Sequence, residues 1–169
     1  MDLMDFDGQE LYFDQPLDGR AEALVAAAAE GYGAGSAEGP LLQAQVLAPE
    51  SLTVLVALYR FYYYQHRLPE ALAVAERALD LTARDLALPR DWRLLTELHV
   101  ARAALVAMGL LRFHLLCLKA LAYLLLRLGR QDEGRAMLRK LLELDTGNRL
   151  GARQLLEVVD PERRDEDAA

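Results

Sequence analysis

The segment RFHLLCLKALAYLLLRLGRQDEGRAMLRKLLELDTGN, residues 112–148, decides the fold of this chain. Up to the turn at Leu128-Gly129-Arg130 it is apolar on almost every side, and after the turn its apolar residues follow a narrower helical stripe. The pattern predicts two helices joined by a tight turn. Such a pair cannot bury all of its apolar surface alone, so further helices are expected to pack on it.

The composition of the whole chain agrees with a fully helical protein. Its 169 residues are enough for one domain with a sizeable core. The strong helix formers Ala, Leu, Glu and Arg are abundant, isoleucine is absent, and the alternation typical of strands is nearly absent. We therefore expect an all-α fold.

Charge and targeting signals narrow the class of protein. The formal net charge of −7 argues against a nucleic-acid-binding protein, because affinity for phosphate backbones comes from clustered Lys and Arg. The acidic N-terminus does not have the order of a signal peptide, and the single cysteine, Cys117, is compatible with a reducing compartment. These features predict a cytoplasmic protein.

Residues 110–128 approach the length of a membrane-spanning helix, but four polar or charged residues interrupt them. These are Arg112, His114, Lys119 and Arg127. Because charges inside a spanning helix are expensive, a buried helix is expected here, with no membrane contact.

Three segments are expected along the chain: an acidic aromatic arm (1–19), a helical domain (20–159) and a charged, disordered tail (160–169). Within the domain, the predicted helices cover residues 20–32, 36–48, 51–67, 69–88, 91–108, 112–127, 131–144 and 150–159. Ser36, Ser51 and Asp91 are the expected N-caps, and Gly109 is the expected break.

A repeat is visible when Gly134 is aligned with Ala71. Leucines and other apolar residues of 118–144 then match those of 55–81, and LLQAQVLAPES (41–51) supplies a third, partial copy. The units resemble the tetratricopeptide repeat (TPR), an antiparallel helix pair of about 34 residues. Gly129 would permit the turn, and the small Ala71 and Gly134 would let the helices of a pair approach closely.

The resemblance to TPR proteins implies a short, irregular solenoid of about six to eight stacked helices. The earlier copy departs from the family pattern, because it has Tyr59 at a position of small residues and His66 at the turn glycine. The separation of Ala71 from Gly134 falls short of two units, so 84–110 is expected to be an insertion or a degenerate half-repeat.

A second resemblance is narrower. The strings LYFDQPLDG, LTVLVALYRFYYYQHRL and YLLLRLGRQDEGRAML are similar to a group of small TPR proteins encoded near nitrogen-fixation genes.

The TPR resemblance also implies a concave groove lined by the first helix of each pair. Six tyrosine or cationic residues fall on groove positions, and they are Arg60, Tyr63, Tyr64, Lys119, Tyr123 and Arg127. Tyr and Arg dominate interface hot spots, and cationic donors would suit an acidic partner segment. The competing interpretation is that these tyrosines pack inside the protein with their hydroxyls reaching water or backbone.

The function expected from these residues is protein–protein interaction, with no catalytic site and no cofactor. The partner would be another protein or peptide, for which an acidic segment is one option, and the acidic arm could occupy the basic groove of its own chain or that of a second copy. One alternative is a homo-oligomer, such as a homodimer, that buries Leu110–Leu128 or Trp92 between subunits. The other is a small metal- or ligand-binding protein using His114 and Cys117, although zinc needs more ligands than this pair supplies.

Overall fold

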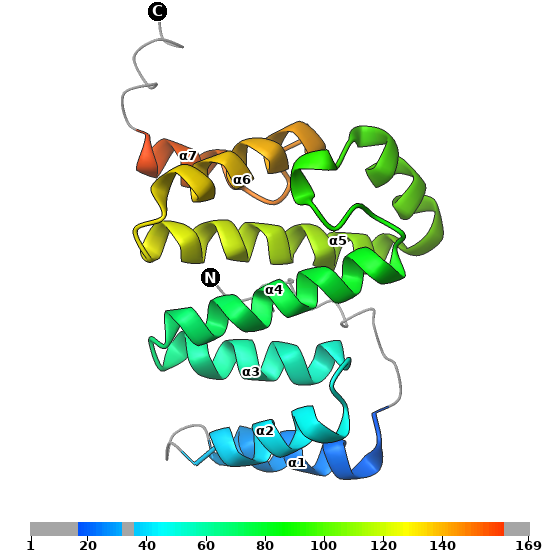
Figure 1. Cartoon of the computed structure of the whole chain (residues 1–169), viewed down its shortest axis with the longest axis vertical. Helices are drawn as coiled ribbons and strands as arrows, with labels where there is room; N and C mark the ends of the chain where they lie inside the picture. Colours follow the sequence, from blue (N-terminus) through cyan, green and yellow to red (C-terminus); the bar gives the residue numbers. More distant parts are fainter. Residues whose placement is uncertain (1–16, 32–35, 161–169) are drawn as a thin grey trace, which may run out of the picture. The chain divides into compact units, whose positions relative to one another are not determined.

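The computed structural model describes residues 17–31 and 36–160, and in these ranges every regular element is a helix (Figure 1). The elements are α1 (Gly19–Gly31), α2 (Glu38–Leu47), α3 (Leu52–Tyr64), α4 (Leu68–Asp85), the 3₁₀-helix η2 (Trp92–Leu94), α5 (Glu97–Arg127), α6 (Gln131–Leu144) and α7 (Ala152–Val159). The described part of the chain is all-α, as predicted, and it has seven α-helices, because the helices predicted at 91–108 and 112–127 are largely replaced by the single α5. Residues 1–16 of the predicted arm and 161–169 of the predicted tail lie outside the described residues.

The chain divides into two compact units, Met1–Leu81 and Thr82–Ala169, with the boundary inside α4. In the described part of the first unit, α1 packs on α2 and α2 packs on α3. The turn at 65–67 joins α3 to α4, and an ion pair of 3.7 Å between Glu50 and Arg77 shows that the two helices run antiparallel. The largest fully buried side chains of the first unit are Leu41, Leu55, Leu58 and Tyr59.

The second unit is built around α5. Helix α6 packs along α5, and both α7 and η2 pack on α6. The core is mainly leucine, as the apolar stretch predicts, and includes Leu111, Phe113, Leu118, Leu121, Leu124, Leu138 and Leu141. By length and composition alone α5 could cross a membrane, and among the described residues it is the one helix that passes this test. Most of its residues between Leu111 and Leu126 are buried within the protein.

The turns of the two aligned hairpins adopt the same left-handed conformation. Gly129 has a φ of +83°, and His66, at the matching position, has a φ of +58°. Glycine enters this region without steric cost, whereas a residue with a Cβ does not. The prediction that Gly129 permits the turn is confirmed, and the alignment with His66 is correct at this point.

The hydrogen bonds of the two turns also correspond one to one. In the first hairpin the amide of Arg67 donates to the carbonyl of Tyr62 at 2.9 Å, and in the second the amide of Arg130 donates to that of Leu125 at the same distance. Each of these hydrogen bonds joins an amide to the carbonyl five residues earlier in the chain. This pattern is typical of the Schellman motif, in which a residue in the left-handed conformation ends a helix. The ion pairs that follow the turns, Arg67–Glu70 and Arg130–Glu133, also occupy matching positions in the alignment.

Replacing His66 with glycine should stabilise the protein by about 1 kcal/mol, because it removes the steric cost of a Cβ in the left-handed region. His66 is exposed, so little packing is lost. Urea denaturation of both proteins measures the difference. A variant that is less stable than the wild type would contradict the argument.

The region before α5 differs from the prediction. A single helix was expected from Asp91 to Met108, but Asp91 caps only η2, through a bond of 3.0 Å from the amide of Arg93. Leu95 then stays extended, because its side chain is buried and its carbonyl accepts from Lys140 at 3.4 Å. The long helix therefore begins after Thr96, whose side chain and that of His99 form a capping box.

Two smaller predictions also need correction. Helix α5 is interrupted at Ala107 (φ −154°, ψ 79°), two residues before the predicted break at Gly109. Ser36 is not the N-cap of α2, because that helix begins after Ala37, which makes no side-chain cap. Ser51 does cap α3, by accepting from the amide of Val54 at 3.4 Å.

Candidate functional site

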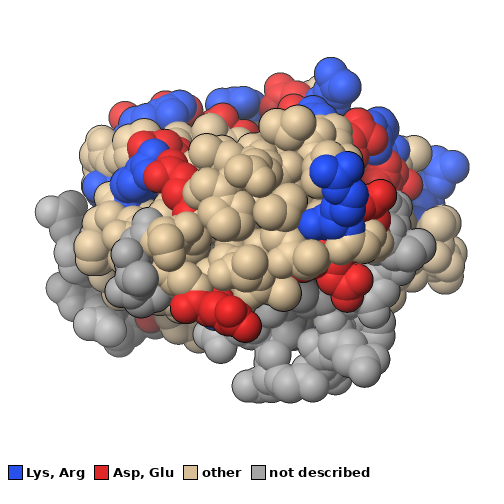
Figure 2. Space-filling view, turned by 90° about the horizontal axis from the view of Figure 1, so that it is seen from below, with Lys and Arg blue, Asp and Glu red and all other residues tan. Residues whose placement is uncertain are grey.

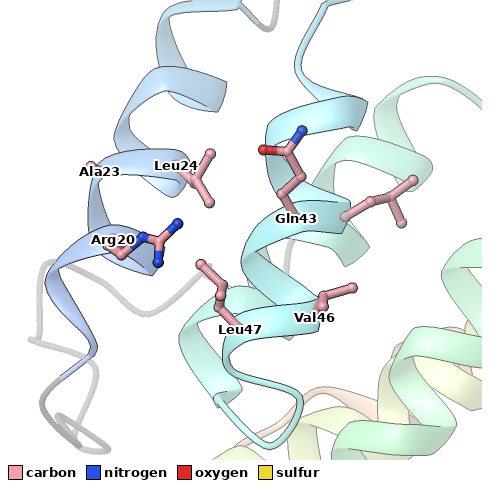
Figure 3. Close-up of a pocket in the computed structure, with 7 residues that line it drawn as sticks. Arg20, Ala23, Leu24, Gln43, Val46 and Leu47 are labelled. Atoms are coloured by element: carbon pink, nitrogen blue, oxygen red, sulfur yellow. The ribbon is translucent and has the colours of Figure 1, made fainter.

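An open pocket of about 660 Å³ lies between α1 and α2. Seven residues line it: Arg20, Ala23, Leu24, Leu42, Gln43, Val46 and Leu47. Figure 3 shows Leu24 on α1 and Leu47 on α2 directed toward each other across this space. The sequence analysis did not single out any of these residues, because none belongs to a chemical motif.

The pocket follows from how α1 and α2 pack. The buried residues of the two helices are Ala21 and Ala28 on α1 and Leu41 and Ala44 on α2, and three of the four are alanines. The small buried side chains of α1 do not fill the space beside the larger side chains of α2. The surface between the two helices is therefore concave, and this concave surface is the pocket. The large residues of α2 stay open to solvent, with exposed fractions of 42% for Leu42, 81% for Val46 and 43% for Leu47.

The lining of this pocket is mostly apolar. Of the described residues that line it, only Arg20 is charged and only Gln43 is a neutral polar residue. Figure 2 shows the face over α1 and α2, where uncharged residues occupy the centre and charged side chains lie toward the margins. The lining supplies neither a nucleophile nor a carboxylate. It can accept apolar side chains and place a guanidinium beside a carboxylate at one end.

The predicted site residues of the first unit lie on α3 among stacked rings. Tyr63 stacks on the buried Tyr59 with ring centroids 5.9 Å apart, and it contacts Tyr64 edge to face at 5.5 Å. Tyr64 is 53% exposed, and Arg60 is half-buried. Tyr63 is therefore partly a packing residue, as the competing interpretation expects, whereas Tyr64 presents its ring to solvent.

The predicted site residues of the second unit lie on α5. Arg127 donates a hydrogen bond of 2.8 Å to the Tyr123 hydroxyl, and its guanidinium carbon lies 5.7 Å from the centre of the Tyr123 ring. Lys119 is half-buried one turn earlier on the same helix. The structure thus joins Tyr123 with Arg127, and the shared groove predicted from all six residues stays a prediction.

His114 and Cys117, the pair considered for metal binding, are both buried in the core of the second unit. The His114 Nδ1 atom and the Thr82 hydroxyl are 2.8 Å apart. Burial lowers the pKa of His114 to about 4 and raises the pKa of the Cys117 thiol. No group of three metal-ligating side chains occurs in residues 17–31 and 36–160. The environment of the pair is that of core residues.

The fold and the pocket therefore define a small all-helical protein with an exposed apolar surface. The chain is 57% identical over 159 residues to a protein of Azotobacter chroococcum mcd 1 described as an uncharacterized 19.8 kDa protein in the nifW 5′ region. The match covers 94% of this chain and 89% of that protein, so the chain belongs to the same family.

The gene location of this relative agrees with the predicted resemblance to proteins encoded near nitrogen-fixation genes. No family model matches the sequence, so the TPR assignment stays a prediction. No solved structure matches the chain.

Proposed function

We propose that this protein is a TPR-like interaction module, without a catalytic site, that acts as a cytoplasmic accessory factor in nitrogen fixation. The Azotobacter relative is described by its place in the nifW 5′ region, and this gene location supports a role in nitrogen fixation. The two hairpins, which share one turn geometry at aligned positions, support the repeat. Helical repeats commonly present extended surfaces to partner proteins.

The observation that carries the binding function is the apolar pocket between α1 and α2. Leucine and valine side chains that remain exposed around a hollow are typical of a surface that a partner covers. The partner segment would place apolar side chains between Leu24 and Leu47, in the manner of a helix or strand docking in a groove. A carboxylate on that segment would lie beside Arg20.

Replacing Val46 with glutamate should abolish capture of partner proteins from a lysate of nitrogen-fixing Azotobacter cells. Val46 is exposed, so the change costs the fold little, but it introduces a charge into the apolar pocket. The measurement compares proteins retained by immobilised wild type and variant. Val158→Glu is the matched control, because this valine is also exposed and lies on α7. Proteins retained equally by all three would exclude the pocket as the binding site.

The tyrosine- and cation-bearing faces of α3 and α5 are a second candidate surface, supported by the exposed ring of Tyr64 and by the exposed Arg127. A Tyr63→Ala/Lys119→Ala double variant in the same capture experiment separates the two surfaces. Partners lost from this variant but retained by Val46→Glu would move the binding site from the α1–α2 pocket to these faces.

A further inference from the structure

The first half of α5, residues 97–106, buries very little of its surface. Ala103 is its one buried residue. On the opposite side of the helix, Leu98 and Leu105 are 66% and 88% exposed, and Ala101 between them is also exposed. Two further exposed apolar residues flank this stripe, Leu94 before it and Met108 after it.

Three of these residues, Leu98, Ala101 and Leu105, lie on the uninterrupted first part of α5 and follow the spacing of a coiled-coil seam. Their separations are three and four residues, which is the pattern of positions a, d and a in a heptad. Leu94 lies on η2 and Met108 follows the interruption at Ala107, so these two residues border the seam without belonging to its register. In this register Ala103 falls on the position farthest from the seam, which agrees with its burial against the rest of the unit. The Thr96 capping box stabilises the start of α5, and the preceding Leu95 is buried in the protein. The stripe therefore lies on a helix whose start is held in place by both contacts.

The charges beside the stripe favour a second copy of the same helix as the partner, in a parallel orientation. Glu97 and Arg102 are exposed and fall on positions g and e, five residues apart. In a parallel pair of these helices, Glu97 of each copy would face Arg102 of the other. In an antiparallel pair, the two Arg102 side chains would face each other and repel.

We propose that the stripe formed by Leu98, Ala101 and Leu105 binds the same stripe of a second copy of this chain in a parallel, two-fold symmetric dimer. Leucines pack against leucines along the seam, and two Glu97–Arg102 pairs flank it. This surface shares no residue with the α1–α2 pocket, so separate variants test the dimer and the proposed partner binding.

Sedimentation velocity of the full chain over a wide range of concentrations tests the dimer. The wild type should show a monomer–dimer equilibrium, and Leu98→Glu should weaken it at least about tenfold, because the charge would enter the seam. Val158→Glu, an exposed site on another helix, should leave the dimer unchanged. A wild type that is monomeric at all concentrations would overturn the proposal, and so would a monomer that instead sediments with phospholipid vesicles.

The charge pairing provides a second test that does not depend on the stability of any single variant. Glu97→Arg alone and Arg102→Glu alone should each weaken the homodimer about tenfold, because like charges would then face each other. An equal mixture of the two variants should restore association, because both flanking pairs become attractive in the mixed dimer. A mixture that associates no better than either variant alone would refute the parallel arrangement.

Discussion

Acidification from pH 7 to pH 4 should cost the wild-type protein about 3 kcal/mol of unfolding free energy through one side chain, His114. Burial lowers its pKa to about 4 in the folded protein, whereas the usual value in an unfolded chain is near 6.5. Between these values the unfolded chain binds a proton that the folded protein does not. Stability is therefore complete above about pH 6.5 and is lost as the pH falls toward 4.

The structural cause is the position of the ring. His114 is 1% exposed, its Nδ1 atom is 2.8 Å from the Thr82 hydroxyl, and its Nε2 atom has no hydrogen-bond partner among the described residues. A proton on this ring would place a charge in a core where burial already disfavours the charged form.

The measurement is urea denaturation of the wild type and of His114→Gln at several pH values between 4 and 7. Glutamine keeps an amide near Thr82 but does not titrate. The loss caused by carboxylates is common to both proteins, so the difference between the two curves isolates the histidine. We expect the wild type to lose more stability than the variant, and parallel curves would show that His114 accepts its proton without cost.

Replacing Gly134 with alanine should destabilise the protein by about 2 kcal/mol, because the added methyl group would overpack the contact between α5 and α6. A Cβ at this position would lie 2.7 Å from Cγ of Leu126 and 2.9 Å from the carbonyl oxygen of Ala122, both on α5. The carbonyl belongs to a helix backbone and cannot move aside alone. Overpacking of this kind costs up to about 3 kcal/mol, and the better helix propensity of alanine returns about 1 kcal/mol.

The matched control is Gly39→Ala, near the start of α2, where a Cβ would meet nothing within 4 Å. That change should leave stability equal or slightly increased, because only helix propensity acts. Thermal or urea denaturation measures both variants. If Gly134→Ala were as stable as the control, the close approach of α5 and α6 would not depend on the missing side chain.

The hairpin was predictable in detail because its signals are local. Gly129 breaks the apolar pattern where the chain reverses, and Gly134 stands where α6 meets α5. His66 was identified as the matching turn residue only through the repeat alignment, because histidine alone gives no indication of a positive φ. The short helix η2 was missed, because its cause is the distant contact of Leu95 with Lys140.

The candidate site was much less predictable from the sequence than the hairpin was. Tyrosines and cations of α3 and α5 were predicted as binding residues from the TPR resemblance and from their chemistry, and this stays a prediction. The sequence did not indicate that Tyr63 stacks on the core residue Tyr59. The pocket residues Leu24, Val46 and Leu47 appeared in the sequence as ordinary apolar positions of short helices. Their exposure depends on which helices pack beside them, and helix periodicity does not carry that information.

The sequence by itself determined an all-α chain, the α5–α6 hairpin and the small residue at its contact, because helix propensity, turn conformation and apolar spacing act over a few residues. Only the tertiary structure decided which apolar faces stay uncovered. Phe113 and Leu118 on α5 are enclosed by neighbouring helices, whereas Leu105 on the same helix and Val46 on α2 remain open to solvent. The physical reason is that burial depends on the neighbours a side chain acquires in the folded chain.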